Sequence, residues 1–362
     1  GKGKWRGTLG KALDMNDNTR RKKDAKDRAQ VTIIDIARMA NVSKKTVSRV
    51  INESPLVREE TREVVKKIIK ETGFTPNPQA RALAFRRSFL IGLVYDNPSP
   101  QYVVNMQRGI LDALDETSFQ LVLRPCDRAD ANYRERVESF VVQHKPYGLI
   151  LTPSVSEDDE LAEMLRDRNC DYVRIASVEI DKPDRIIRTH DAQGAELAAR
   201  HLAQLGHRRI GHIHGPNTFR STHERLAGFK KGLAEFGLTL DPNLTMEGAY
   251  TFDSGVQCAT TLLHKQDRPT AVFAGNDEMA VGVYVAARKA GLQIPEDLSI
   301  VGFDDTPISA RIWPPMTTVR SPIRDVGRAA ARRLIQVDGG SDAQPPGAFA
   351  LELIVRDSTQ AL

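Results

Sequence analysis

Short apolar runs alternate with helical patterns from Phe89 onward, and this alternation limits the possible folds more than any other feature of the sequence. Helical periods such as LAARHLAQL and MAVGVYVAARKAG separate the apolar runs, which are FLIGLVY, FQLVLRP, YGLILT, YVRIA, RIGHIH, TAVFAG and SIVGFDD. Strands that are apolar along their whole length are buried on both faces, as in parallel sheets covered by helices. We therefore predict an α/β region with parallel sheets and helices on both faces.

This α/β region spans residues 89–358, about 270 residues, which exceeds one ordinary domain. We therefore expect two lobes, joined by chain crossings near Thr189 to Gln193 and near Arg320 to Ile323. The expected N-lobe comprises about 89–190 and 322–340, and the C-lobe about 191–321 and 345–358. The last strand candidate is FALELIVRDS, and no heptad pattern follows it. We therefore expect a dimer rather than a tetramer formed through a helical tail.

The first part of the chain follows an all-helical pattern over residues 31–75. One short helix is expected to begin after Thr32 and a second after Ser43, because these hydroxyls can accept hydrogen bonds from a first helical turn. A third helix is expected over 59–72 and ends at a glycine. Its predicted apolar stripe consists of Val64, Val65, Ile68 and Ile69. Arg58 stands where a small capping residue often precedes a helix, so that cap is in doubt.

Charge is divided unevenly along the chain. Residues 1–87 hold 22 basic and 10 acidic residues, a net charge of +12, whereas the remainder holds 30 basic and 37 acidic residues, a net charge of −7. Attraction to phosphate grows with the number of cations that reach the backbone. The basic segment is therefore expected to bind a polyanion, with a merely solvated charge run as the alternative. Residues 1–30 are expected to form a disordered basic arm.

Two short helices joined by a tight turn can read DNA. The second helix enters the major groove while the first braces it across the backbone, and the second helix here carries Lys44, Lys45 and Arg49. Such cations can donate to guanine O6 and N7, which makes a guanine-rich half-site our hypothesis. Polar side chains suited to phosphate contacts are Thr32, Ser43, Thr46, Ser48 and Asn52. The alternative is a small helical bundle with a solvated basic face.

The segment VTIIDIARMANVSKKTVSRVIN, followed by TREVVKKIIKETGFTPNPQARAL, resembles the DNA-binding head of the LacI/GalR (lactose/galactose repressor) family. Later blocks stand in the family's order, namely HLAQLGHRRIGHIHGP, RLAGFKKGL, AVFAGNDEMAVGV, IPEDLSIVGFDD and PPMTTVRSPI. The resemblance extends from Val31 to about Ser358. It implies a transcriptional regulator of the repressor type, whose affinity for operator DNA is controlled by a small metabolite.

By the same resemblance, residues 76–88 form a hinge that folds on the operator. Two copies, one from each subunit of a homodimer, enter the minor groove at the centre of a pseudo-palindromic site. Asn77 and Ala80 lie in this hinge as candidate DNA contacts, and Leu83 matches the leucine wedge of the family. Such a wedge unstacks one base step and bends the duplex. An ordinary apolar linker residue is the alternative reading of Leu83.

The acidic α/β region resembles the periplasmic sugar-binding proteins, in which two lobes close on a ligand. Arg225, Asn276 and Asp304 match the family's ligand-contacting positions, and Tyr250 matches an aromatic position that can cover one face of the ligand. Asp96 and Trp313 are weaker candidates. The alternative for each residue is a structural salt bridge or a core aromatic. A charged fork and a carboxylate suit neighbouring sugar hydroxyls, which both donate and accept hydrogen bonds. The implied effector is a mono- or disaccharide, with a nucleobase as the alternative. Release from DNA and recruitment to DNA by the ligand both occur in the family.

Other classes of protein find little support in the sequence. Cys126, Cys170 and Cys258 lack the spacing of a disulfide framework or a zinc site, and the family uses no metal at His212 and His214. No nucleophile elbow, phosphate-cradling loop or dinucleotide fingerprint is present, so we expect no enzymatic activity and no cofactor. No apolar stretch approaches about 18 residues, and we expect a cytoplasmic protein. The main alternative function is a sugar-binding protein without DNA-linked regulation.

Overall fold

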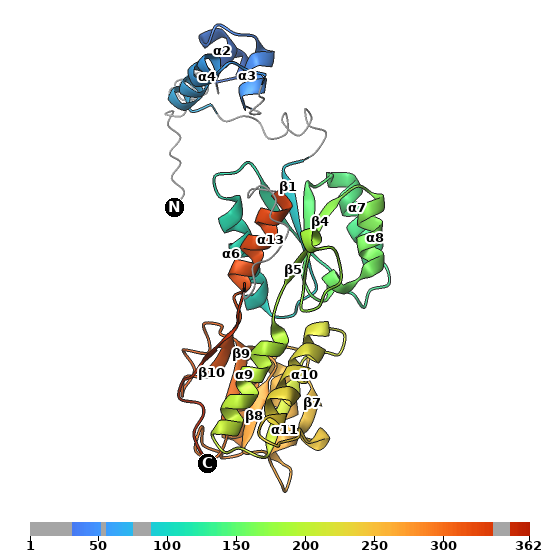
Figure 1. The fold of residues 1–362 in the computed structure, drawn as a ribbon, viewed down its shortest axis with the longest axis vertical. Helices are drawn as coiled ribbons and strands as arrows, with labels where there is room; N and C mark the ends of the chain where they lie inside the picture. Colours follow the sequence, from blue (N-terminus) through green and yellow to red (C-terminus); the bar gives the residue numbers. More distant parts are fainter. Residues whose placement is uncertain (1–30, 52–55, 75–87, 336–347) are drawn as a thin grey trace, which may run out of the picture. The chain divides into compact units, whose positions relative to one another are not determined.

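The computed structural model describes residues 31–51, 56–74, 88–335 and 348–362. The chain divides into two compact units, Gly1–Phe85 and Arg86–Leu362 (Figure 1). The expected basic arm and most of the expected hinge lie outside the described residues. The same holds for the candidate DNA contacts Asn52, Asn77, Ala80 and Leu83.

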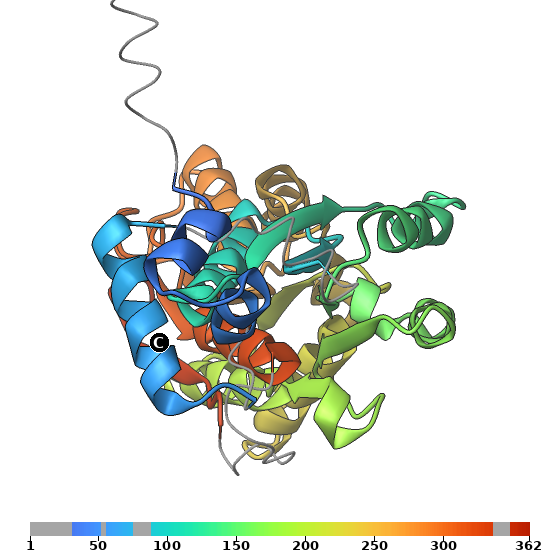
Figure 2. The same cartoon turned by 90° about the horizontal axis from the view of Figure 1, so that it is seen from above.

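The described part of the first unit is a head of three helices, α2 (Ile33–Met39), α3 (Lys44–Ile51) and α4 (Glu59–Thr72), which Figure 2 shows from above. Their common core consists of Ile36, Ala37, Val47, Val50 and Val65. Val64 is 49% exposed, so its expected place on the inner stripe is wrong. It directly precedes the fully buried Val65, and adjacent residues on a helix point about 100° apart.

Side chains cap α2 and α3 as the sequence predicts. The Thr32 hydroxyl accepts a hydrogen bond from the Asp35 N–H, and the Asp35 carboxylate accepts one from the Thr32 N–H at 3.0 Å, which completes a capping box. The Ser43 hydroxyl accepts a hydrogen bond from the Thr46 N–H at 3.0 Å. Arg58 makes no side-chain cap for α4, and Gly73 ends this helix in the left-handed conformation.

The first sheet of the second unit has five parallel strands in the order β2-β1-β3-β4-β5. The strands are β1 (Leu90–Tyr95), β2 (Gln120–Pro125), β3 (Gly148–Leu151), β4 (Asp171–Ala176) and β5 (Ile186–Arg188). Helices α6 (Pro100–Leu114) and α13 (Ile323–Ile335) cover one face. Helices α7 (Tyr133–His144) and α8 (Asp159–Asp167) cover the other (Figure 1). The short helices η1 (Val155–Glu157) and η2 (Pro183–Arg185) lie in its connections.

The second sheet has six strands in the order β11-β10-β9-β8-β6-β7. They are β6 (Ile210–His214), β7 (Thr245–Glu247), β8 (Ala271–Ala274), β9 (Ser299–Asp304), β10 (Thr317–Arg320) and β11 (Glu352–Ile354). Helices α9 (Asp191–Gln204) and α10 (Arg220–Ala234) pack on one face. Helices α11 (Phe252–Leu263) and α12 (Asp277–Lys289) pack on the other, and η3 (Pro242–Leu244) precedes β7.

The predicted parallel sheets with helices on both faces are confirmed, with one exception at an edge. Strand β11 pairs with β10 in the antiparallel sense. It occupies the edge of the sheet, where a strand needs one partner and no helical crossover fixes its direction. Strands β5, β7 and β10 had no counterpart among the predicted apolar runs, because these short strands, IIR, TME and TTVR, mix apolar with polar or charged residues.

Two connections between the lobes lie wholly within the described residues. The chain passes from β5 in the first sheet to α9 beside the second through residues 189–190, and from β10 to α13 through residues 321–322. Among the described residues, no helix is both long enough and apolar enough to cross a bilayer.

Candidate ligand cavity and DNA-reading surface

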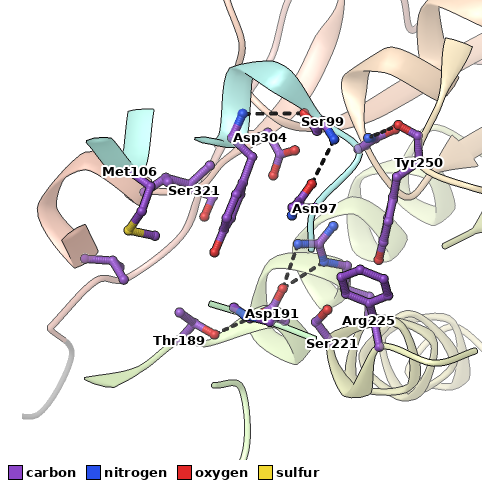
Figure 3. A pocket seen from close by; sticks show the side chains of 16 residues that line it. Asn97, Ser99, Met106, Thr189, Asp191, Ser221, Arg225, Tyr250, Asp304 and Ser321 are labelled. Carbon is purple, nitrogen blue, oxygen red and sulfur yellow. Dashed lines mark hydrogen bonds and ion pairs between the residues drawn. The ribbon is translucent and has the colours of Figure 1, made fainter. Parts of the chain in front are cut away.

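A cavity lies between the two lobes, at the carboxyl ends of strands from both sheets (Figure 3). It holds about 600 Å³ that no protein atom occupies, open solvent included. Its lining residues are Asn97, Ser99, Tyr102, Met106, Pro153, Thr189, Asp191, Phe219, Ser221, Arg225, Tyr250, Asn276, Asp304, Ser321, Ile323 and Val326. Ligands of open parallel sheets bind beyond the carboxyl ends of strands, so this cavity is the candidate ligand site.

Arg225 of α10 and Asp191, the first residue of α9, form an ion pair on the cavity wall (Figure 3). Nε and Nη2 of Arg225 each lie 2.8 Å from Oδ1 of Asp191, and Nη1 donates to the carbonyl oxygen of Gly275. The guanidinium carbon lies 3.7 Å from the centre of the Phe303 ring. Burial is the largest single effect and by itself lowers the pKa of Arg225, but the nearby acidic groups, Asp191 first among them, together outweigh burial and raise the pKa.

Asp304 ends β9 with its carboxyl in the cavity, and it is 8% exposed. None of the described residues donates a hydrogen bond to this carboxyl. Burial raises the pKa of Asp304 to about 8, although Arg225 opposes the rise. An acceptor that is both buried and unoccupied is suited to bind the hydroxyl groups of a ligand.

Asp277 supports the turn that carries Asp304. Its Oδ2 accepts hydrogen bonds from the Thr306 N–H at 2.6 Å and the Thr306 hydroxyl at 2.8 Å, and its Oδ1 accepts one from the Thr318 hydroxyl at 2.6 Å. Asp304 and Asp305 both have positive φ angles, 110° and 51°. The buried carboxyl of Asp277 thus holds an unfavourable backbone turn in place, and burial raises its pKa to about 7.

Tyr250 and Asn276, two further predicted contacts, also line the cavity. The Tyr250 hydroxyl lies 2.9 Å from the Thr222 hydroxyl. The Asn276 amide donates to the carbonyl oxygen of Tyr250 at 3.0 Å, while its oxygen accepts from the Met279 N–H and caps α12. Asn276 therefore fixes the Tyr250 backbone, and one amide hydrogen and one lone pair remain for a ligand.

Asp96 and Trp313, the weaker candidates, are not among the residues that line this cavity. The Asp96 carboxyl accepts a hydrogen bond from the Arg128 N–H at 3.2 Å, so it faces the loop after β2. Trp313 is 86% exposed. Asp96 lies just after a strand and Trp313 lies just before two prolines, and neither position determines where the side chain points.

Sequence reasoning missed most of the polar lining. The missed residues are Asn97, Ser99, Tyr102, Thr189, Asp191, Ser221 and Ser321. Asn97 and Ser99 follow β1, Thr189 follows β5, and Ser321 follows β10. The position of these four residues just after a strand could have identified them. Strands β5 and β10, however, had not been predicted.

The predicted DNA-reading side chains lie at the start of α3. Lys44 and Lys45 are exposed, and Arg49 is half-buried on the same helix. The Ser43 and Thr46 hydroxyls lie 2.8 Å apart. The hydroxyls of Ser43 and Thr46 therefore already hold the start of α3 in place before a phosphate binds.

The contacts of His212 indicate a structural role. Its ring stacks on Phe273 at a centroid distance of 5.0 Å, and its Nδ1 donates to the Phe273 carbonyl oxygen at 3.0 Å. Burial lowers the pKa of His212 to about 3, which keeps the ring neutral. Within the described ranges, no cluster of three histidine, cysteine or acidic side chains has a geometry that could hold a metal ion.

A helix-turn-helix head joined to a two-lobed domain with a cavity between its lobes defines a DNA-binding regulator with a small-molecule site. Family models agree with this class, since that of bacterial regulatory proteins of the lacI family matches residues 32–77 and that of a periplasmic binding protein-like domain matches 199–359. The chain belongs to the LacI family of transcriptional regulators.

Relatives match the chain over nearly its whole length. The HTH-type transcriptional regulator DegA of Bacillus subtilis (strain 168) is 33% identical over 337 residues, which are 92% of this chain and 99% of the relative. The structure of a transcriptional regulator CelR–cellobiose complex has a TM-score of 0.67 at 32% identity, covering 91% of this chain and 99% of that one. A lac repressor dimer bound to operator and the anti-inducer ONPF has a TM-score of 0.73 at 30% identity, with the same coverage.

Proposed function

We propose that this LacI-family regulator binds a mono- or disaccharide between its lobes and that this sugar controls its affinity for a pseudo-palindromic operator. The observation that carries the proposal is the buried, unoccupied carboxyl of Asp304 in a cavity that also holds the Arg225–Asp191 pair. Sugar hydroxyls both donate and accept hydrogen bonds, and charged acceptors and donors bind them strongly. The cellobiose complex of CelR, with 32% identity, supports a sugar as the ligand.

Aromatic side chains complement these polar groups. Tyr102, Phe219 and Tyr250 line the same cavity, and the rings of Phe219 and Tyr250 meet edge to face at 5.5 Å. Their apolar faces suit the C–H face of a sugar ring, while Asp304 and Arg225 suit its hydroxyls. Small-molecule sites commonly combine apolar and aromatic walls with a few oriented polar groups.

The sugar acts through the relative position of the lobes. Glu157 of the first lobe accepts hydrogen bonds from the backbone N–H of Arg220, the first residue of α10 in the second lobe, at 3.1 and 3.3 Å. A ligand that binds one lobe arrangement better than another shifts the population between them, by typically about 1–3 kcal/mol. In a homodimer, this shift changes the spacing of the two segments 76–88 that precede the lobes, and hence the affinity for the operator.

The test has two parts. Selection from a pool of randomised duplexes identifies the operator, and fluorescence anisotropy then measures operator affinity with and without each sugar of a panel. We expect a palindromic consensus with guanine in each half-site, and at least one sugar that changes the affinity fivefold or more. A chain that binds sugars but enriches no duplex would be a sugar-binding protein without DNA-linked regulation. Because this regulator acts on DNA, the proposal places it in the bacterial cytoplasm.

A further inference from the structure

The charge balance of the ligand cavity indicates which class of sugar it accepts, an inference that rests on the proposed function. Three of the lining residues are acidic or basic, namely Asp191, Arg225 and Asp304, and the raised pKa of Asp304 leaves the Arg225–Asp191 ion pair as the charged groups at neutral pH. The two carboxyl groups therefore outnumber the single cation. A ligand that enters this cavity encounters acceptors in excess, and its own charge decides whether the surroundings attract or repel it.

Arg225 is the single cation of the cavity lining, and it is already paired with Asp191. Both Nε and Nη2 of Arg225 lie 2.8 Å from the Asp191 carboxylate, and Nη1 donates to the Gly275 carbonyl oxygen. The side chains of Arg225 and Asp191 are 13% and 9% exposed, so solvent screens this pair weakly. The second carboxylate oxygen of Asp191 accepts a hydrogen bond from the Thr189 hydroxyl at 2.7 Å, which fixes its orientation.

Helix N-termini near the cavity are also occupied. A free helix N-terminus binds anions through its unpaired N–H groups. Here Glu157 accepts from the first N–H of α10, and Asn276 caps α12. The hydroxyl of Ser99 accepts from the Tyr102 N–H at the start of α6. These acceptors satisfy N–H groups that would otherwise bind an anionic ligand.

The environment of Tyr102 agrees with this negative balance. Burial raises the pKa of its hydroxyl above the ordinary value. The charges of Asp191 and Asp304 raise the pKa further, and Arg225 opposes them. Removing the proton of the Tyr102 hydroxyl would add a negative charge to the cavity, and the raised pKa indicates that such a charge is disfavoured there.

We propose that Asp191 determines the charge selectivity of the site: because it already neutralises Arg225, the cavity accepts uncharged sugars and rejects those that carry a carboxylate or a phosphate. An acidic sugar would have to displace Asp191 from Arg225 or place its charge beside the Asp191 carboxylate in a cavity whose single cation is already paired. An unpaired buried charge and like charges brought together both oppose binding. An uncharged sugar can donate to Asp304 and Asp191 while the ion pair stays intact.

Matched sugars that differ in charge test the selectivity. The probes are glucose with glucuronate and glucose 6-phosphate, galactose with galacturonate, and cellobiose, titrated calorimetrically into the full chain at constant ionic strength. We expect every sugar that binds to be uncharged and its acidic counterpart to bind at least tenfold more weakly. A uronate or sugar phosphate that binds more tightly than its uncharged counterpart would overturn the inference while leaving the sugar-responsive regulator in place.

The isosteric substitution Asp191→Asn tests the residue itself, independently of which sugar is the effector. It leaves Arg225 as a buried cation without a carboxylate partner, so acetate and glucuronate should bind the variant at least tenfold more tightly than they bind the parent. The double variant Asp191→Asn, Arg225→Met should lose this gain. Unchanged acetate and glucuronate affinity in a folded Asp191→Asn variant would refute the role of Asp191.

Asp112→Asn is the matched control, since Asp112 pairs with Arg324 and Arg328 on the surface, away from the cavity lining. It should gain no affinity for anions. Circular dichroism reports whether each variant folds. If no sugar of any charge binds the parent but acetate still binds Asp191→Asn, the sugar proposal fails and the charge-selecting role of Asp191 survives.

Discussion

Arg225 and Asp191 lie 34 positions apart in the sequence, and yet Nε of Arg225 donates a hydrogen bond of 2.8 Å to the Asp191 carboxylate, while Nη2 lies 2.8 Å from the same oxygen. Asp191 begins α9 directly after the chain passes from one lobe to the other, and Arg225 lies on α10. The ion pair therefore joins a side chain of the cavity lining to the connection between the lobes. Disturbing it should affect ligand binding and the stability of the second unit, and leave the head intact.

Arg225→Met should abolish the thermal stabilisation that the effector gives. It removes the guanidinium and leaves the buried Asp191 carboxylate without its partner, a change that costs about 3–5 kcal/mol in such pairs. Differential scanning calorimetry with and without the effector measures both effects. Arg324→Met, which removes an exposed partner of Asp112, should leave the stability nearly unchanged, because solvent screens exposed ion pairs, and it should keep the ligand response. A ligand-induced shift that survives Arg225→Met would exclude Arg225 as a contact.

Lys44→Ala and Lys45→Ala should each relax the base preference of the operator. Both side chains are exposed at the start of α3, and a bidentate contact to guanine gives about 1–3 kcal/mol of discrimination. Anisotropy titrations with the selected operator and with duplexes changed at single guanines measure this loss. Lys67→Ala on α4, where the lysine is 77% exposed, serves as the control. Equal discrimination in all three variants would contradict the assignment.

Gly228→Ala should separate α10 from α9. A methyl group at this position would lie 2.0 Å from the carbonyl oxygen of Ala192, the residue after Asp191. Overpacking of this kind costs about 1–3 kcal/mol, and the displaced helix would weaken the Arg225–Asp191 pair. Urea unfolding and effector titration should both show a loss, whereas Lys230→Ala, at an exposed position of the same helix, should show neither. Wild-type stability of Gly228→Ala would show that the helices can separate freely.

The stability of the second unit should fall as the pH rises from about 4 to 8. Burial raises the pKa of Asp304 to about 8 and that of Asp277 to about 7, whereas both titrate near their ordinary value of 3.8 in the unfolded chain. The folded state therefore holds protons that the unfolded state has released, and their stabilising effect is lost as the pH passes the folded pKa values.

Urea unfolding followed by circular dichroism at intervals from pH 4 to pH 9 measures this dependence. Asp304→Asn should remove its share of the slope and be more stable than the parent above pH 8, because no charge is buried there. A variant with the same slope as the parent would show that Asp304 is ionised in the folded protein at neutral pH. Arg324→Met again provides a substitution outside the cavity.

Local pattern was enough to predict most of the secondary structure, and a family resemblance supplied four of the cavity residues. Apolar runs marked the strands β1, β2, β3, β4, β6, β8 and β9, and the hydroxyls of Thr32 and Ser43 marked two helix starts. Arg225, Tyr250, Asn276 and Asp304 came from a family resemblance in their surrounding motifs, and all four line the cavity. The burial pattern of a strand and the cap of a helix depend on residues that are close in the sequence, so both can be predicted from it.

Tertiary structure decided which of these side chains meet and how they are used. Asp191 follows a three-residue strand that shows no pattern, and its partner Arg225 approaches it only because α9 packs on α10. Distant contacts also tied the Asn276 amide to the Tyr250 backbone and directed Asp96 to another loop, while Trp313 is left exposed. The direction of a side chain at a lobe boundary depends on residues far along the chain, and no local pattern records them.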